Sequence, residues 1–322
     1  MTFSWLPPDT RFQLIDVGAR GDFHDVFAPI QSQTEVIAFE PDREEAARMS
    51  ASLAQSLWQK ATVLPHAVGH TQSNRDFHLF QMREFSSLLL PNPSVLRGKT
   101  GVVERTIQLD TIGLDDLYLQ GTLPQTIDFI KVDTQGSELE ILQSSEARIL
   151  PHLLGIETEV EFVEAYQNQP LFHDINIYLH QAGFELVILT TKYRMTGTTP
   201  HTRRLLFAGD AVFLRGSRFL GSCSEQERGT VLPKLLAIYA LYGLWSAALD
   251  LATQFAPAIA VQIQADYDSL KTTSLRWRGA LLRDFILAWL SGDRTRRVRL
   301  ARRAMRVIPA NGFDWDIATI NE

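Results

Sequence analysis

The feature that most constrains this chain is the alternation, over its first two thirds, of short apolar runs with segments of helical character. This alternation predicts βα units that build a mostly parallel sheet covered by helices on both faces. The last two runs have no helical segment between them, so we expect them to pair antiparallel at the end of the sheet. The runs expected to form strands are Phe12–Val17, Glu35–Glu40, Thr62–His66, Val102–Gln108, Asp128–Val132, Leu153–Val160, Phe184–Leu189 and Leu205–Leu214, and Asp76–Phe80 is a candidate hairpin insertion.

The character of the sequence changes after Arg215. Residues 216–224 are rich in Gly and Ser, and the remainder is rich in Ala, Leu and Arg without a strand pattern. Helical spacing is found over Thr230–Phe255 and Thr273–Leu290, and Arg294–Arg306 is expected to form a short helix with seven arginines. We therefore predict an α/β domain over residues 1–215 and an all-helical domain over residues 216–322.

Charge and cysteine content argue against several classes of protein. Lys and Arg number 31 against 37 Asp and Glu, and a formal net charge of −6 gives no overall cationic field for a nucleic acid. Cys223 is the single cysteine, so an internal disulfide and a Cys-based zinc site are excluded. The apolar run Leu235–Leu249 is shorter than the roughly 20 residues that span a bilayer. We expect a cytoplasmic protein with no secretory signal and no transmembrane segment.

Two polar segments follow the first two expected strands. Asp16–Gly21 opens the segment after the first strand, where glycines permit positive φ and a helix N-terminus offers N–H donors to an anionic group. The spacing G-x-G-x-x-G is absent, which argues against a dinucleotide fingerprint. Glu40 ends the second strand 22 residues after Gly18, where a carboxylate can accept hydrogen bonds from ribose hydroxyls. The alternatives are a plain tight turn and a solvated carboxylate before a helix.

Two further strands end in carboxylates. Asp133 follows the apolar strand of the segment Ile127–Glu138, so it is expected in the same crevice as Gly18 and Glu40. Its alternative role is to cap the next helix. Glu157, Glu159 and Glu161 alternate along one face of the following strand, and a carboxylate whose pKa is raised by such neighbours suits a general base. The alternative for these three is an exposed strand end.

These segments together resemble the FkbM family of S-adenosylmethionine (SAM)-dependent methyltransferases. The resemblance runs in order over residues 10–215, through Asp16–Gly21, Phe39–Asp42, Ile127–Leu142 and the stretch from Glu159 to Phe184, and Ile127–Leu142 is its most specific part. It implies a Rossmann-like, seven-stranded, mostly parallel sheet that ends in a reversed hairpin. It also implies O-methylation of a hydroxyl on a sugar, a glycan or a secondary metabolite.

The resemblance also implies roles for individual residues. The cofactor residues would be Asp16, Gly18, Ala19, Arg20 and Gly21 at the methionine part, Glu40 with Pro41 at the ribose, and Ala67 and Val68 at the adenine. Asp133 would lie beside the sulfonium and the acceptor, and Glu159 is the second carboxylate of the pocket. Arg20 departs from the family motif, which usually has Asn there. Residues 216–322 lie outside the resemblance.

The chemistry requires an oxygen nucleophile held in line with the methyl group and a group that removes its proton. Asp133 or Glu159 is the candidate base, with His173 or a divalent cation as a candidate assistant, although no dense metal-ligand motif is present. Acceptor choice is expected to depend on the loops Phe85–Gly101 and Lys192–Arg204.

Two alternatives involve other parts of the chain. The core could bind cofactor or a partner without catalysis, and the helical region would then mediate contact with a partner or a membrane surface. Arg294–Arg306 could contact an anionic membrane surface weakly or simply be a solvated helix face. The aromatic residues Tyr239, Tyr242 and Trp245 are expected to pack against other helices, with a homo-oligomer interface as the alternative.

Overall fold

The computed structural model describes residues 3–19, 25–53, 56–195 and 204–270. Arg20 and Gly21 therefore lie outside the described residues, as do the expected helices Thr273–Leu290 and Arg294–Arg306. The chain divides into two compact units, one of residues 1–2 and 6–242 and one of residues 3–5 and 243–322.

The first unit is built on a mostly parallel sheet. Its strands follow the order β10-β11-β8-β7-β1-β2-β3, and β9 also pairs with β11. Their bounds are β1 (Phe12–Val17), β2 (Thr34–Phe39), β3 (Lys60–Leu64), β7 (Phe129–Val132), β8 (Gly155–Glu161), β9 (Glu185–Leu189), β10 (Lys192–Met195) and β11 (Arg204–Leu214). β11 runs antiparallel to both β8 and β9, which confirms the expected reversed pairing at the end of the sheet. The Rossmann-like prediction is thus confirmed, with β3-β2-β1-β7-β8-β11-β9 as the seven expected strands.

The eighth strand, β10, was expected to be part of a loop. β11 has 11 residues and is too long for β9 alone, so β9 pairs with its carboxyl half and β10 with its amino half. Thr190 lies between the two short strands, and its backbone N–H donates to the Asp210 carbonyl at 2.9 Å. The pairing along β11 thus brings Lys192 into the sheet.

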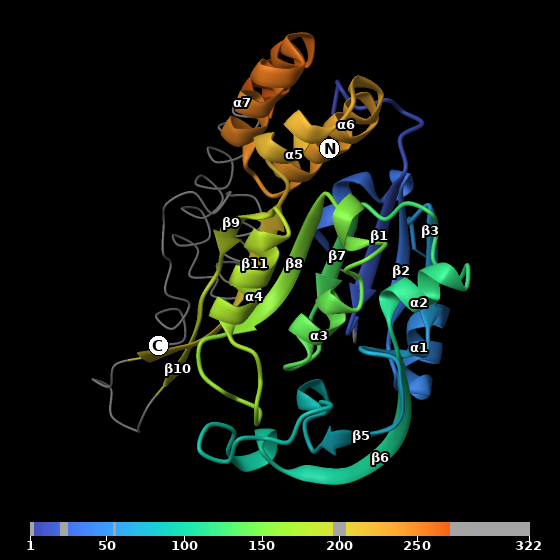
Figure 1. Cartoon of the computed structure of the whole chain (residues 1–322), viewed down its shortest axis with the longest axis vertical. Helices are drawn as coiled ribbons and strands as arrows, with labels where there is room; N and C mark the ends of the chain where they lie inside the picture. The colour runs from blue at the N-terminus through green and yellow to red at the C-terminus, as the bar shows by residue number, and fades with distance from the viewer. Residues whose placement is uncertain (1–2, 20–24, 54–55, 196–203, 271–322) are drawn as a thin grey trace, which may run out of the picture. The chain divides into compact units, whose positions relative to one another are not determined.

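A second sheet has the order β4-β6-β5, formed by β4 (Ala67–Val68), β5 (Gln72–Phe80) and β6 (Val103–Ile112). β5 confirms the hairpin insertion expected at Asp76–Phe80, because it pairs antiparallel with β6. The placement of Val102–Gln108 in the main sheet was wrong. Most of β6 is exposed, and a strand of this kind cannot replace the buried strands of a parallel sheet. The small sheet lies beyond the carboxyl ends of the parallel strands (Figure 1).

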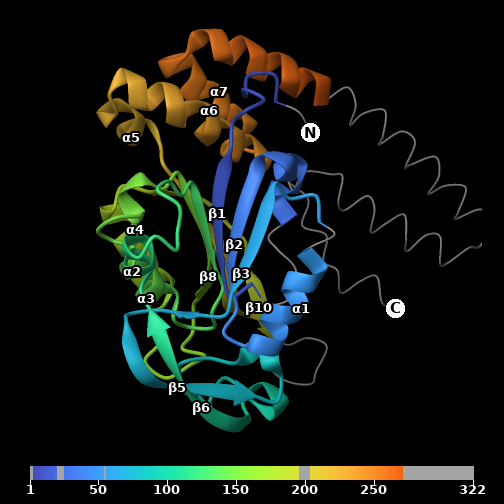
Figure 2. The same ribbon diagram turned by 90° about the vertical axis from the view of Figure 1, so that its right-hand side faces the viewer.

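Helices cover the two faces of the main sheet differently (Figure 2). On one side lie α2 (Leu114–Leu119), α3 (Glu138–Gln143) and α4 (Phe172–Gln181), and on the other lies α1 (Arg43–Leu53), with η1 (Asp25–Gln33) following β1. α1 ends at Leu53, and the Asp42 carboxylate accepts from two backbone N–H groups of its first turn. The remaining short turns are η2 (Arg83–Phe85), η3 (Gly98–Thr100) and η4 (Leu150–His152).

The two faces of the sheet also differ in chemistry. Ile15, Ile130, Ile156 and Phe213 are register neighbours across four strands and belong to the main apolar core under α2, α3 and α4. The next residues along these strands point to the other face. There Asp16, Lys131 and Glu157 stand side by side, so a row of charged groups crosses this face.

Two helices complete the first unit, α5 (Ser217–Ser222) and α6 (Glu225–Leu241). On α6 the Lys234 ammonium lies 2.9 Å from both carboxylate oxygens of Asp128. The compact units divide after Tyr242, whereas the sequence changes character after Arg215. The extent of the methyltransferase domain, residues 1–215, stays a prediction.

The single helical segment expected over Thr230–Phe255 is two helices, α6 and α7 (Trp245–Phe255). Gly243 separates them with φ of 77°, a conformation that few residues other than glycine adopt. Tyr239 is 3% exposed and Trp245 9% exposed, so both pack inside the chain. Trp245 contacts the rings of Phe3, Trp5 and Tyr267 in the second unit.

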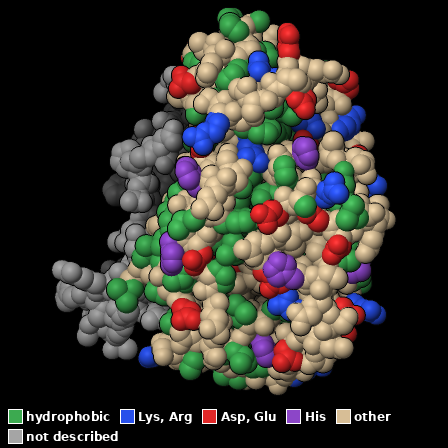
Figure 3. Space-filling view, in the orientation of Figure 1, with side chains coloured by type: hydrophobic (Ala, Val, Ile, Leu, Met, Phe, Trp, Pro, Cys, Tyr) green, Lys and Arg blue, Asp and Glu red, His purple; other side chains and the backbone are tan. Residues whose placement is uncertain are grey.

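On the face drawn in Figure 3, acidic and basic side chains of the described residues are interspersed. This is consistent with the small net charge of the sequence. None of the helices formed by the described residues combines the length and the apolar character that a membrane span requires.

Candidate functional site

A cavity of about 210 Å³ lies at the carboxyl ends of the central strands. One wall comes from the main sheet and its loops, and the other comes from the small sheet and η2. Its lining residues are Val17, Gly18, Phe39, Glu40, Pro41, His66, Ala67, Val68, Phe77, Arg83, Glu84, Ser86, Leu88, Asp133, Thr134, Gln135 and Ser137. The carboxyl ends of the parallel strands β1, β2, β3 and β7 therefore meet at the crevice that the sequence predicted.

Gly18 forms the floor of this cavity. It has φ of 78°, and a Cβ atom placed on it would lie 1.9 Å from the carbonyl oxygen of Asp133. Its N–H donates to the Phe39 carbonyl at 3.1 Å, and the N–H of Ala19 donates to the same oxygen at 3.3 Å. A glycine is required here because the chain turns in a left-handed conformation against the end of β7.

Glu40 and its neighbours form the next part of the wall. Glu40 is 4% exposed, so the alternative of a solvated carboxylate is wrong. Its Oε1 accepts from the Asp42 N–H at 2.8 Å, which orients the side chain at the cavity. Ala67 and Val68 lie on the same lining as two buried apolar residues.

Asp16 does not line the cavity in the described residues. Its side chain is fully buried, and its Oδ1 lies 3.6 Å from the Lys131 ammonium. Burial disfavours the ammonium, but Asp16, Asp133 and Glu157 outweigh this effect and raise the pKa of Lys131. Lys131 therefore stays charged between three carboxylates. Ala19 is likewise buried behind the lining.

Asp133 does line the cavity, and its side chain is 34% exposed. The alternative role of helix cap is wrong, because α3 begins at Glu138 with Ser137 as its N-cap. The Gln135 amide links Asp133 to Glu159: its Nε2 donates to Asp133 Oδ1 at 3.1 Å and to Glu159 Oε2 at 2.8 Å. The structure thus brings together the two carboxylates that the sequence selected, although Glu159 is not among the described residues that line the cavity.

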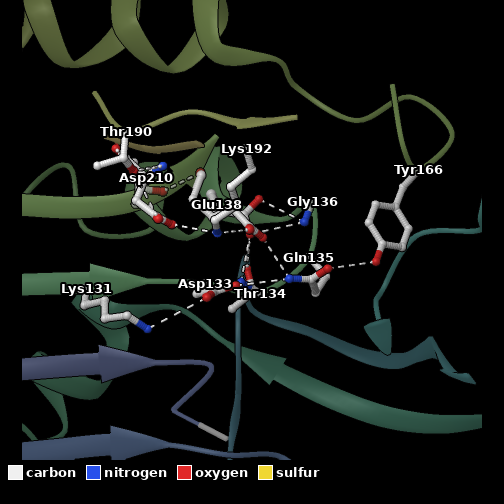
Figure 4. A network of polar contacts seen from close by, with 12 residues as sticks. Lys131, Asp133, Thr134, Gln135, Gly136, Glu138, Tyr166, Thr190, Lys192 and Asp210 are labelled. Atoms are coloured by element: carbon white, nitrogen blue, oxygen red, sulfur yellow. Dashed lines mark hydrogen bonds and ion pairs between the residues drawn. The ribbon is translucent and has the colours of Figure 1, made fainter. Parts of the chain in front are cut away.

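The turn that carries Gln135 is held by several contacts (Figure 4). Gln135 has φ of 62° and Gly136 φ of 110°. The buried Glu138 carboxylate accepts from the backbone N–H groups of Thr134 and Gly136 at 2.8 to 3.1 Å. Tyr166 donates its hydroxyl to Gln135 Oε1 at 3.0 Å, which fixes which end of the amide faces the carboxylates.

Glu159 lies on β8, and its side chain is 11% exposed. Burial and then the charge of Asp133 raise its pKa to about 8, although the Lys192 ammonium lies 2.9 Å from its Oε1 and acts in the opposite direction. Lys192 also pairs with Asp210 at 3.0 Å, so it connects β8 to the edge of the sheet. A proton therefore resides on Glu159 at neutral pH in much of the population.

Glu161 is 3% exposed, so β8 does not end as an exposed strand. Burial, Glu138 and Glu159 raise the pKa of Glu161 well above its ordinary value. Burial and the surrounding carboxylates also raise the pKa of Tyr166, which keeps its hydroxyl protonated as a donor. Glu157 accepts from the Tyr242 hydroxyl at 2.6 Å and faces Lys131.

Several site residues were not assigned a role from the sequence. Gln135 and Glu138 belong to the segment that carried the resemblance, and Lys192 begins a loop that we associated with the acceptor. Tyr166 has no sequence signal that points to the site. His173, the candidate assistant, is 68% exposed on α4 and does not line the cavity.

In the described part of the chain, no three His, Cys, Asp or Glu side chains are grouped in a way that could hold a metal ion. The carboxylates that approach one another are held instead by amide, ammonium and backbone N–H donors.

Comparison with protein families identifies the chain. The model of the FkbM methyltransferase domain matches residues 16–186. This chain belongs to the FkbM methyltransferase family. The match begins at Asp16 and includes the glycine turn, Glu40 and the segment around Asp133, which confirms the resemblance seen in the sequence. The matched family is described as a family of methyltransferases.

Solved methyltransferase structures are similar to the chain at low sequence identity. The FkbM methyltransferase from Methylobacillus flagellatus KT is 15% identical, with a TM-score of 0.36, and the match covers 64% of this chain and 44% of that one. Magnesium protoporphyrin IX methyltransferase from Synechocystis PCC 6803, solved with bound SAM, is 10% identical, with a TM-score of 0.33 and coverage of 65% and 72%. Precorrin-6y C5,15-methyltransferase from Geobacter metallireducens GS-15 is 12% identical, with a TM-score of 0.33 and coverage of 66% and 85%. A search of curated proteins gave no match.

Proposed function

We propose that this FkbM protein is an O-methyltransferase that uses SAM to methylate a hydroxyl of a sugar, a glycan or a secondary metabolite. The observation that carries the proposal is that Gly18, Glu40 and Asp133 line one cavity, and that Gln135 joins Asp133 to a second carboxylate, Glu159. The side chain of Gln135 therefore links the candidate cofactor cavity to the candidate base.

The lining residues fit the parts of SAM. Glu40 is oriented at the cavity as an acceptor for ribose hydroxyls, and Ala67 and Val68 offer apolar surface to the adenine. Gly18 lines the cavity beside Asp133 and has no side chain there, which suits the methionine part. Arg20 and Gly21 remain candidates for the same part from outside the described residues.

SAM supplies an activated methyl group, so the chain must align the acceptor and remove one proton. Asp133 is accessible from the cavity and can accept a hydrogen bond from the acceptor hydroxyl. Burial raises the pKa of Glu159 to about 8, which suits a group that accepts a proton during the transfer. Gln135 keeps the two carboxylates in a fixed relation while either one gains a proton.

The surroundings of Glu159 favour a polar acceptor. Thr190 between β9 and β10, Lys192 on β10 and Asp210 on β11 carry hydrogen-bonding groups beside Glu159. Such groups can pair with several hydroxyls of one acceptor. We further propose that the protein acts in the cytoplasm on a small-molecule or glycan acceptor.

Isothermal titration with SAM and S-adenosylhomocysteine (SAH) tests the cofactor site. We expect micromolar binding of both ligands to the wild type and its loss in Glu40→Ala. Glu44→Ala is the matched control, because Glu44 is an exposed glutamate on α1. Absence of binding to folded wild-type protein would refute the proposal. Binding would then justify a screen of glycosides and other hydroxyl compounds for methyl transfer.

The second candidate is a scaffold that binds cofactor or a partner without catalysis. The clustered carboxylates argue against it, because a scaffold gains nothing from burying Glu138, Glu159 and Glu161 near one another at an energetic cost. Asp133→Ala and Glu159→Ala distinguish the two: an enzyme loses methyl transfer, whereas a scaffold keeps its function.

A further inference from the structure

The pair formed by Asp133 and Glu159 is unusual because an amide, and not a cation, lies between the two carboxylates. The Gln135 Nε2 has two hydrogens, and it gives one to Asp133 and one to Glu159. Its Oε1 accepts from Tyr166, and its backbone carbonyl accepts from the Ser87 hydroxyl. The amide therefore cannot turn away without losing contacts on both sides.

Negative groups outnumber positive groups around this pair. The groups that act on Glu159 are Asp133 from the turn after β7, Glu138 from α3, Glu161 from β8, Tyr166 from the loop after β8, Lys192 from β10 and, through Lys192, Asp210 from β11. Lys131 lies 3.9 Å from Asp133 on its other side. One ammonium at Glu159 thus faces several carboxylates, and the surplus negative charge makes full ionisation unfavourable.

A ligand bound in the cavity would lie close to this surplus negative charge. Asp133 and Gln135 both line the cavity, so a positive charge bound there lies against one member of the pair and against the amide that holds the other. A bound cation favours ionised carboxylates, and a neutral ligand of the same shape does not. SAM carries a positive sulfonium, whereas SAH has a neutral thioether at the same position.

We propose that the clamp of Asp133, Gln135 and Glu159 senses the charge of the ligand: Glu159 holds a proton until a sulfonium occupies the cavity, and it then releases that proton and becomes the catalytic base. The inference rests on the proposed function. It means that the base forms only when the methyl donor is in place.

The charges balance through the transfer step. The acceptor oxygen forms a bond to the methyl carbon, the bond between that carbon and sulfur breaks with its electron pair on sulfur, and the hydroxyl proton moves to Glu159. One positive and one negative charge disappear together, so the net charge of the site does not change. Glu159 ends protonated beside a neutral thioether, which is the state that the empty clamp already favours.

Calorimetry tests this without knowledge of the acceptor. SAM and SAH are each titrated at pH 7 in two buffers of different ionisation enthalpy, which counts the protons released on binding. With a pKa of about 8 for Glu159, we expect SAM to release roughly 0.5–1 proton more than SAH. The amino and carboxylate groups common to both ligands cancel in this difference. The affinity ratio of SAM to SAH should also rise by up to about tenfold for each pH unit between pH 6 and pH 8.

Substitutions test whether the proton released on SAM binding comes from Glu159. Glu159→Gln should bind both ligands and release equal numbers of protons with each. Gln135→Met removes both amide donors at similar size, and the pH at which the affinity ratio rises should move upward. Glu146→Gln, a change of an exposed glutamate, should behave as the wild type.

Three outcomes would count against the inference. Equal proton release by SAM and SAH in the wild type would overturn it and leave the proposed function intact. A difference that survives in Glu159→Gln would also overturn it, because another group would then carry the proton. Failure of both ligands to bind would refute the proposed function itself.

Discussion

Replacement of Glu159 by glutamine should make the protein more stable at alkaline pH. In the folded chain burial raises the pKa of Glu159 from 4.5 to about 8, so the folded state binds this proton more tightly than the unfolded chain does. The stabilisation from this proton is complete below about pH 4.5 and is lost as the pH rises to about 8. Glu159→Gln keeps a neutral side chain at every pH and should escape that loss.

The size of the effect follows from the pKa values. From 4.5 to about 8, at about 1.4 kcal/mol for each pH unit, the full loss is about 5 kcal/mol. Glu138 and Glu161 interact with Glu159, so the bound proton is shared among the three carboxyl groups. We therefore expect Glu159→Gln to raise the free energy of unfolding by about 2–4 kcal/mol above pH 8. The lost ion pair with Lys192 subtracts about 0–1 kcal/mol, because Lys192 is half exposed and keeps Asp210.

Urea unfolding followed by circular dichroism at pH 5, 7 and 8.5 measures this. The free energy of unfolding of Glu159→Gln should match that of the wild type near pH 5 and exceed it increasingly at pH 7 and 8.5. Glu146→Gln should stay within about 0.5 kcal/mol of the wild type at every pH. If wild type and Glu159→Gln show the same pH dependence, Glu159 does not carry a raised pKa and the argument for its role as base fails.

Three further predictions concern the cavity and the scaffold. Gly18→Ala should lower SAM affinity at least tenfold by titration, because its Cβ would lie 1.9 Å from the Asp133 carbonyl oxygen. Arg215→Met should lower the free energy of unfolding by about 3 kcal/mol in urea, since the 5% exposed guanidinium donates to four backbone carbonyls, whereas the exposed Arg218→Met should change little. Ser224→Ala should cost about 1 kcal/mol in the same assay by removing the capping box of α6; no loss would show that the cap is dispensable.

The βα pattern of the sequence was sufficient for the main sheet because its strands are buried and strongly apolar. Phe12–Val17 and Asp128–Val132 were recognisable without any knowledge of their partners. The pattern could not tell which sheet a strand joins. Val102–Gln108 has strand character, but its partner is β5, and that pairing depends on contacts across the loop between them.

The candidate site was predictable where one residue acts within its own segment. Gly18, Glu40 and Asp133 each directly follow a strand, so their common crevice follows from the topology alone. The clamp was not predictable, because it depends on contacts between distant segments. Gln135 reaches Glu159 across 24 residues and Tyr166 across 31, and Lys192 reaches Glu159 across 33.

The division of chemistry between the two faces of the sheet also limits how this chain can vary. Along β8, Ile156 and Val160 enter the apolar core, and Glu157, Glu159 and Glu161 point the other way. Insertion or deletion of a single residue in β8 would exchange these sets and drive three carboxylates under the helices. A change of two residues would preserve the faces and only slide the carboxylates along the strand. Length changes in this strand should therefore be tolerated only in pairs, so that the fold itself preserves the spacing of the polar groups.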